Sequence, residues 1–467
     1  MKNFKAWIVK LNNARFGLVE KVLLLAPIVV WFSYYPNLYI GRSDGTNLEF
    51  SISLIYVVIL AAAGLTTIWA NRHQLIKNRA AIATGVFVFW NFLSIIWGAN
   101  PVRGFLNSGV WLVLWLCFLT VLSLKNIGRL APILMQIFIG TATIVSILAI
   151  LQVIYGAWTD WGLCGGCLAR GFGFVRPSVF AVEPQFLGNL LLVPIIILFY
   201  KLFRQSIGTV EKLSLLIMLV AMYLTLSRGA IYALVLALGV LSIINVKAYG
   251  AKSKKTISSL LYFLAAGFIF GMTFHGVFTE LNPRVADGFY DSVTKSINQL
   301  SLGVVKLPDM PKGNDRVDVP SDNSGAPPNK ALFSGYVEKS TNERSKLNAL
   351  AVKTWSQNWH TILLGVGAGG SGKAMYDFNR STGWDMEIVQ NEYLSVLLEL
   401  GLIGAMLFVG LIAGAIYLAR REKWLWSILV GFLAQWMFFS GLPNVLHIYL
   451  ILGVMFSFIM YREKKLA

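Results

Sequence analysis

One arginine interrupts a long apolar stretch near the middle of the chain. Residues 213–246 are almost entirely apolar, and Ser227, Arg228 and Gly229 form their main interruption. A guanidinium between two apolar helices is costly in a membrane, so it usually faces a polar cavity or a charged partner. Fixed guanidiniums can bind phosphate oxygens through paired hydrogen bonds and stabilise a negatively charged leaving group. Arg228 is therefore the first candidate for a functional residue; the alternative is that it only anchors a helix end at the outer headgroups.

A second cation and a carboxylate precede another apolar stretch. In the segment RPSVFAVEPQFLG, Arg176 and Glu183 stand just before a helix whose first position suits Pro184. A carboxylate at that end is favoured by the helix dipole, so Glu183 either caps the helix or accepts a proton from a reacting hydroxyl. Arg176 adds a second positive charge to the same face of the protein.

Composition decides what kind of protein holds these residues. Of 467 residues, 56% are apolar and only 13% are charged, against roughly 25% charged residues in soluble domains. A cytosolic globular enzyme is excluded. The net charge of +18 would fit a nucleic-acid binder, but a membrane protein with basic cytoplasmic loops reaches the same total.

The elements that position the candidate residues are apolar runs of about 20 residues, the length that spans a bilayer. We expect an all-α integral membrane protein with about twelve spans, at 17–36, 51–70, 80–97, 105–124, 130–155, 185–203, 213–226, 229–246, 257–276, 396–418, 424–440 and 444–461. The polar break at Arg228 divides residues 213–246 into a helical hairpin. A single long helix there would place ten later Lys and Arg residues on the wrong face of the membrane.

Charge assigns a side to each segment. With the N-terminus inside, the short inner loops are strongly basic and the outer segments are close to neutral, which predicts cytoplasmic termini and a periplasmic active site. The basic excess then reports orientation, and no nucleic-acid partner is expected. We expect three parts: 1–276, with nine spans and an outer loop at 156–184; a large periplasmic loop at 277–395; and 396–467, with the last three spans. Within the large loop, 300–340 is expected to be flexible and 343–395 partly helical.

Two other motifs are weaker candidates for a functional site. The segment GVGAGGSGK resembles a nucleotide-binding loop, but Ala374 stands where that loop needs Ser or Thr, so we expect a flexible turn beside the active site. Cys164 and Cys167 could form a small disulfide in an oxidising compartment, which the sequence leaves open. The four histidines are scattered and no outer carboxylate cluster stands out, so no metal and no cofactor are expected.

Four motifs in order resemble the bacterial O-antigen ligase and polymerase superfamily, membrane glycosyltransferases of the GT-C type. They are RPSVFAVEPQFLG, LTLSRGA, an arginine followed by a helix and a GVGAG turn, and QNEYLSVLLELGLIG. The resemblance covers about residues 170–420. It implies a GT-C-like fold and transfer of a glycan from a polyprenyl diphosphate carrier, usually undecaprenyl diphosphate, to an acceptor hydroxyl.

The resemblance also suggests roles for individual residues. Arg228 and Arg344 look like the family's essential arginines, and Gln390 stands where the family normally has a histidine. A neutral Gln can orient a hydroxyl but cannot accept its proton, which leaves Glu183 as the best acceptor. Arg176, Ser227, Asn391 and Glu392 complete the expected substrate-binding set. The expected reaction is a metal-independent, inverting, in-line displacement.

Three functions remain open. A polymerase extends one carrier-linked glycan with another, and the missing histidine together with the Glu183–Pro184 pair slightly favours it. A ligase instead moves the glycan to lipid A core or to a protein. The third, from another class, is a polytopic lipid or glycan transporter, but such proteins usually have charges near the midplane and repeated halves, and neither is visible here.

Overall fold

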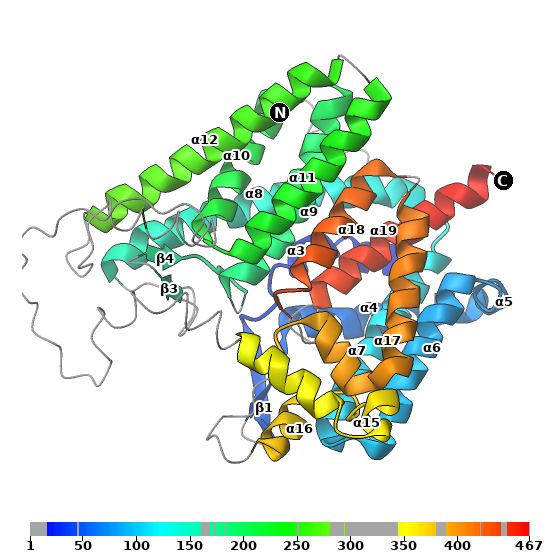
Figure 1. Cartoon of the computed structure of the whole chain (residues 1–467). Helices are drawn as coiled ribbons and strands as arrows, with labels where there is room; N and C mark the ends of the chain where they lie inside the picture. Colours follow the sequence, from blue (N-terminus) through cyan, green and yellow to red (C-terminus); the bar gives the residue numbers. More distant parts are fainter. Residues whose placement is uncertain are drawn as a thin grey trace, which may run out of the picture.

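The computed structural model is a bundle of helices (Figure 1). It describes residues 16–43, 46–159, 169–171, 174–181, 183–249, 252–280, 294, 344–379, 389–420, 422–439 and 446–466. Helices form most of this part of the chain, and the only sheets within it are two short hairpins. The prediction of an all-α membrane protein is confirmed.

Eight helices in the described residues are long and apolar enough to cross a bilayer, and each coincides with a predicted span. They are α4 (Ile52–Ala70), α6 (Arg79–Leu93) continued by η1 (Ser94–Trp97), α7 (Pro101–Ser123), α8 (Ile127–Thr159), α9 (Pro184–Arg204), α11 (Arg228–Tyr249), α12 (Lys252–Glu280) and α17 (Glu392–Ala419). The short helix α5 (Arg72–Leu75) joins α4 to α6.

The other four predicted spans contain no apolar helix of that length. Residues 17–36 contain α2 (Leu18–Leu23) and α3 (Ala26–Val29), and the remaining three hold α10 (Thr209–Leu224), α18 (Lys423–Gln435) and α19 (Leu446–Leu466), of which Leu446–Arg462 is the apolar part. Sixteen residues of α10 extend about 24 Å, less than the ~30 Å of a bilayer core. The total of about twelve crossings therefore stays a prediction, with eight supported by helix length.

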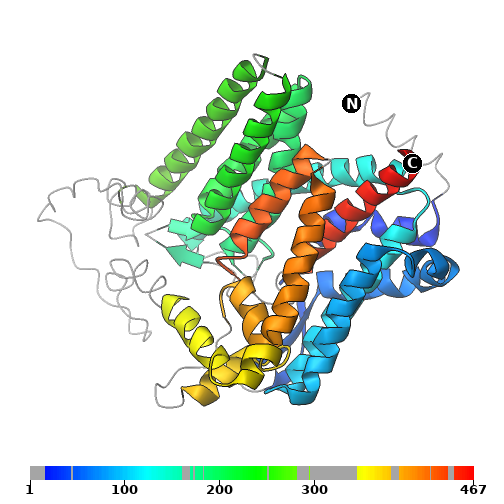
Figure 2. The same ribbon diagram turned by 45° about the vertical axis from the view of Figure 1, so that its right-hand side comes forward.

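Three groups of helices lie side by side in Figures 1 and 2. The helices α10, α11 and α12, drawn green, form one edge, and α4, α6 and α7, drawn blue, form the other. The helices α17, α18 and α19, in orange and red, lie between them. Contacts agree with this view, because α18 packs on α11 and α9, α17 packs on α6, and α19 packs on α7.

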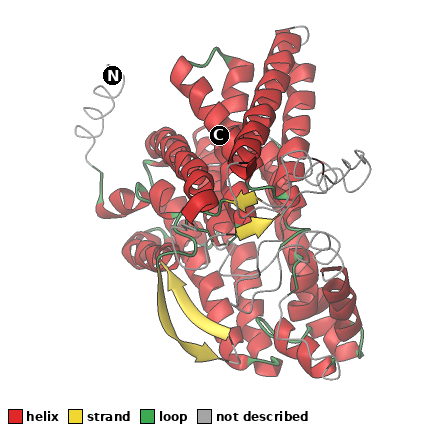
Figure 3. Cartoon of the chain, turned by 90° about the vertical axis from the view of Figure 1, so that its left-hand side faces the viewer, coloured by secondary structure: helices red, strands yellow, loops and turns green. Residues whose placement is uncertain are grey.

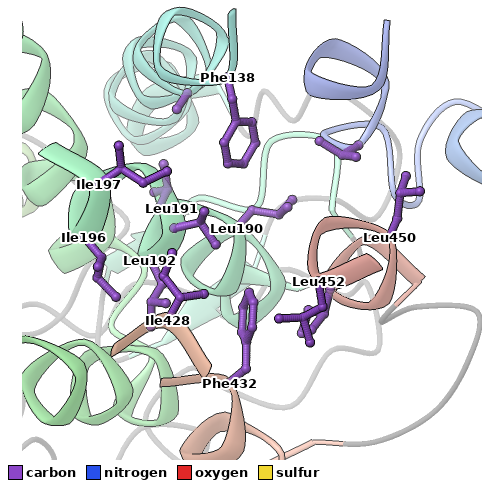
Figure 4. Packing of buried hydrophobic residues seen from close by; sticks show 14 of the residues in the cluster. Phe138, Leu190, Leu191, Leu192, Ile196, Ile197, Ile428, Phe432, Leu450 and Leu452 are labelled. Atoms are coloured by element: carbon purple, nitrogen blue, oxygen red, sulfur yellow. The ribbon is translucent and has the colours of Figure 1, made fainter. Parts of the chain in front are cut away.

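The core is built around α9. Residues 184–199 are all buried, as expected for a helix that is apolar on every side. Leu190, Leu191 and Leu192 lie among Phe138, Ile428, Phe432, Leu450 and Leu452, which come from three other helices, α8, α18 and α19 (Figure 4). The helix that starts immediately after Glu183 is thus a fixed central axis.

Two hairpins lie in segments predicted to be outside the membrane (Figure 3). Strands β1 (Asn37–Ser43) and β2 (Thr46–Ser51) form one, and β3 (Ala169–Gly171) and β4 (Phe174–Arg176) form the other. Because β4 ends at Arg176, this hairpin positions the predicted second cation, whose guanidinium reaches the residues that follow α10.

The described part of the predicted large loop is helical. It contains a helix at 344–355, α15 (Trp359–Leu364) and α16 (Ser371–Phe378). A small apolar core joins them to the start of α17; its buried members are Ala351, Val366, Met375, Val389 and Leu398. Cys164, Cys167 and the segment 300–340 lie outside the described residues, as do the predictions made for them.

Candidate active site

Two of the predicted arginines are neighbours. The helices α10 and α11 are separated by residues 225–227, so the polar break does form a helical hairpin, and Arg228 is the first residue of α11. Arg344 begins the described part of the helix 344–355. Both are half-buried, and they are close enough for their positive charges to interact. Two like charges repel, so this arrangement is suited to an anion that lies between them.

The third predicted cation, Arg176, holds the hairpin turn. Its Nε donates a hydrogen bond to the Thr225 carbonyl at 2.9 Å, and Nη2 donates to the Leu226 carbonyl at 3.5 Å. His275 of α12 also interacts electrostatically with Arg176. Part of the guanidinium is therefore hydrogen-bonded to the protein backbone, and Arg176 stabilises the turn that precedes Arg228.

Backbone strain is concentrated at the two segments that Arg176 connects. Leu226 has a φ of 46° and Val179 a φ of 56°, the only positive values among non-glycine residues in the described chain. Such conformations persist only where surrounding contacts enforce them, and they often mark functional sites. At Val179 the contact comes from buried Gln152 of α8, whose Oε1 accepts hydrogen bonds from the backbone N–H groups of Ser178 and Val179 at 3.1 and 2.9 Å.

Ser227 and Gly229 have packing roles at the start of α11. Ser227 is only 3% exposed, and its Oγ accepts a hydrogen bond from the Ala230 N–H at 3.4 Å, so it caps the helix. A Cβ atom at Gly229 would lie 3.1 Å from Cβ of Phe438, so α11 approaches the end of α18 very closely. Ser227, which the sequence predicted to bind substrate, is therefore buried beneath the surface of the site.

Glu183 occupies the N-cap position of α9 without capping it. Its carbonyl accepts a hydrogen bond from the Phe186 N–H at 3.0 Å, but its carboxylate forms no cap hydrogen bond and the side chain is exposed. Of the two interpretations offered by the sequence, the cap is not observed. An exposed carboxylate at this end of the bundle can accept a proton from a hydroxyl.

The segment that contains Gln390 is fixed by the two residues after it. Asn391 caps α17 by accepting a hydrogen bond from the Leu394 N–H at 3.2 Å, and its Nδ2 donates to the Met437 carbonyl at 3.3 Å. Glu392 is 4% exposed, and its N–H donates to the Trp436 carbonyl at 2.8 Å. Gln390 remains half-buried just ahead of them. Asn391 and Glu392, both predicted to bind substrate, are thus occupied in holding the helix start.

Residues 436–438, which follow α18, join three motifs that are far apart in the sequence. We call them the 436–438 turn. Its carbonyls accept hydrogen bonds from Glu392, Asn391 and the Nε2 of Gln185, the last at 3.3 Å. Its Phe438 side chain packs against Gly229. Sequence reasoning missed this turn because backbone carbonyls have no signature in a sequence.

The glycine-rich segment at 365–370 is a tight structural turn. Gly365, Gly367 and Gly369 have positive φ angles, and Gly369 donates its N–H to Oε2 of Glu399 in α17 at 2.8 Å. The hydroxyl of Ser371 donates to Oε1 of the same carboxylate at 2.7 Å. The segment is held against α17 by these bonds, so the structure contradicts the expectation of a flexible turn.

Comparison with known families agrees with this convergence of motifs. Residues 213–409 match the family described as O-antigen ligase. The match supports the resemblance to the O-antigen ligase and polymerase superfamily. No curated protein matches the chain. Together with the eight long apolar helices, the match supports a multi-pass membrane enzyme of the O-antigen ligase and polymerase type.

The matched region covers only part of the candidate site. It includes the arginine pair, Arg228 and Arg344, and the segment 390–392. Arg176 and Glu183 precede it, and the 436–438 turn follows it. Among the described residues, no group of three or more His, Cys, Asp or Glu side chains is placed to hold a metal ion.

Proposed function

We propose that this protein transfers a glycan from undecaprenyl diphosphate to an acceptor hydroxyl at the periplasmic face of the bacterial inner membrane. The observation that carries the proposal is the arginine pair, because Arg228 and Arg344 come from a membrane hairpin and an extramembrane helix and yet have interacting charges. The match of residues 213–409 to the O-antigen ligase family supports a lipid-linked glycan as the substrate class.

In this reaction the bond between the sugar's anomeric carbon and the diphosphate oxygen breaks, and a bond from that carbon to the acceptor oxygen forms. The leaving diphosphate takes the electron pair and gains negative charge. Two guanidiniums can bind its oxygens and stabilise that charge without a metal. Arg228 is also the first residue of α11, where the helix dipole adds partial positive charge. We propose an in-line displacement that inverts the anomeric centre.

The acceptor hydroxyl must lose a proton as it attacks. We propose that the exposed carboxylate of Glu183 takes this proton and releases it to water. Gln390 cannot take it, because a neutral amide has no basic site, but its carbonyl and NH₂ groups can orient a hydroxyl. We propose two roles for Arg176. It stabilises the 225–227 turn that precedes Arg228, and it also contributes to binding of the diphosphate.

Two acceptors are compatible with this site. We slightly favour a polymerase, in which the acceptor is another carrier-linked glycan, because Gln390 replaces the histidine normal for the family. The alternative is a ligase that transfers to lipid A core or to a protein, and it is favoured by the description of the matching family as O-antigen ligase. Basic inner loops support cytoplasmic termini and a periplasmic site.

Product analysis tests the proposal. Purified protein in proteoliposomes is incubated with undecaprenyl diphosphate-linked oligosaccharide and a panel of carrier-linked, lipid A core and peptide acceptors. A ladder of products on the carrier indicates a polymerase, and a single transfer to another acceptor indicates a ligase. Movement of the intact carrier-linked glycan across the vesicle membrane, without any change of attachment, would overturn the proposal in favour of a transporter.

A further inference from the structure

A tyrosine outside the family-matched region reaches the site from the last helix. Tyr449 of α19 donates a hydrogen bond from its hydroxyl to Oε1 of Glu392 at 2.7 Å. Its ring stacks on Trp436 with centroids 5.6 Å apart and meets Trp111 edge-on at 4.6 Å. The direction of the hydroxyl is thus fixed by two aromatic neighbours.

The side chain of Glu392 is buried and hydrogen-bonded within the protein. Its side chain is 4% exposed, and its backbone N–H is bound to the Trp436 carbonyl. A buried carboxylate needs hydrogen-bond donors, and the Tyr449 hydroxyl supplies one. The residue therefore fixes the first turn of α17, directly after Gln390.

The contacts around Glu392 extend, through the 436–438 turn, to the residue next to Arg228. Trp436 begins the 436–438 turn, and Phe438 at its end packs against Gly229, the residue next to Arg228. Glu392 and this turn therefore fix the position of Gln390 relative to Arg228. Displacing two reacting groups by even 1 Å can slow a reaction considerably.

We propose that Tyr449 is a positioning residue, whose hydrogen bond to Glu392 keeps Gln390 and the bound acceptor in line with the donor at Arg228. The proposal rests on the proposed function, since it assigns Gln390 to the acceptor. It places a required residue in the C-terminal helix, beyond the 213–409 region.

The test is the Tyr449→Phe variant, which removes one hydroxyl and keeps the ring between Trp436 and Trp111. Turnover of the transfer reaction is expected to fall on the order of tenfold, as for the loss of a hydrogen bond to a charged group. The KM for the carrier-linked donor is expected to stay unchanged because the arginine pair is intact.

Tyr393→Phe is the matched control. The Tyr393 hydroxyl also links α17 to α18, because it donates a 2.7 Å hydrogen bond to the Leu433 carbonyl. The acceptor of this bond is a backbone carbonyl and not the Glu392 carboxylate. We expect near wild-type turnover in this variant. Equal losses in both tyrosine variants, or full turnover in Tyr449→Phe, would overturn the proposal.

A readout independent of activity separates this proposal from the proposed function. In a Gln390→Cys background, Tyr449→Phe is expected to raise the rate of thiol labelling at position 390 several-fold, and Tyr393→Phe is expected to leave it unchanged. Unchanged labelling in Tyr449→Phe would contradict the positioning role. Wild-type transfer by Arg228→Ala would instead refute the proposed function, whatever the labelling shows.

Discussion

The side chains of Arg228 and Arg344 come close enough for their charges to interact, although more than 100 residues separate them in the chain. Arg228 begins a helix long and apolar enough to cross a membrane, and Arg344 belongs to a helix in the segment predicted to lie outside. The like charges of two half-buried guanidiniums repel, and this favours the binding of an anion near both. Their pairing is the strongest structural argument for a site that binds diphosphate.

The close packing of α11 on the 436–438 turn should be essential for placing Arg228. In Gly229→Ala, the new Cβ would lie 3.1 Å from Cβ of Phe438, so Phe438 must move by a few tenths of an ångström. We expect a loss of transfer activity. Gly239→Ala in the same helix is the control, since nothing lies within 4 Å of its Cβ. It should keep activity and gain about 0.5–1 kcal/mol in stability. Equal activity of the two variants would contradict this role.

Glu183 should matter for the reaction and not for stability. Its carboxylate forms no cap hydrogen bond, so Glu183→Gln should leave the melting temperature unchanged. Transfer should fall by about 10²–10⁴-fold, because Gln cannot accept a proton. Adding Gln390→His to this variant supplies a basic group next to the acceptor and should restore part of the rate. Full activity of Glu183→Gln alone would remove Glu183 from the mechanism.

The kink of α17 should depend on a single glycine. Gly401 has a φ of 65°, and a Cβ there would overlap the Leu363 carbonyl. Gly401→Ala is expected to lower the melting temperature of the purified protein and its transfer activity together. Gly410→Ala, farther along the same helix with nothing within 4 Å of its Cβ, should be tolerated. If both variants melt alike, the kink is not needed for the fold.

Two fully buried glutamines should respond oppositely to the same substitution. Neither side-chain polar atom of Gln435 has a hydrogen-bond partner among the described residues, so Gln435→Leu is expected to stabilise the protein by about 1–3 kcal/mol. Gln152→Leu removes the acceptor for two backbone N–H groups of the strained segment and should be destabilising. Calorimetry or thermal unfolding in detergent measures both. A destabilised Gln435→Leu protein would indicate that the amide binds an internal water.

The helices were easier to predict from the sequence than the site. Apolar run length identified the eight long spans, and the polar break at Arg228 identified the α10–α11 hairpin. The segment 17–36 was harder, because apolar composition does not reveal that its helix is interrupted between Leu23 and Ala26. The inner and outer assignments stay predictions based on charge.

For the site, residue type alone indicated Arg228, Arg176 and Glu183, and the family resemblance added Arg344. The structure then showed that some of the predicted residues form hydrogen bonds within the protein. Ser227 caps a helix, and Glu392 is buried against Tyr449. Neither relationship could be inferred from the sequence, because both depend on tertiary packing between segments far apart in the chain.

The most direct test of the central claim is the transfer rate of Arg228→Ala and Arg344→Ala in proteoliposomes, with undecaprenyl diphosphate-linked glycan as donor. Each variant is predicted to lose about 10²–10³-fold in rate, and the double variant little more, because both residues act on one leaving group. Arg72→Ala, an arginine that contacts the Trp69 carbonyl at the end of α4, should be unaffected. Wild-type rates in an Arg228→Ala protein that inserts normally would contradict the account.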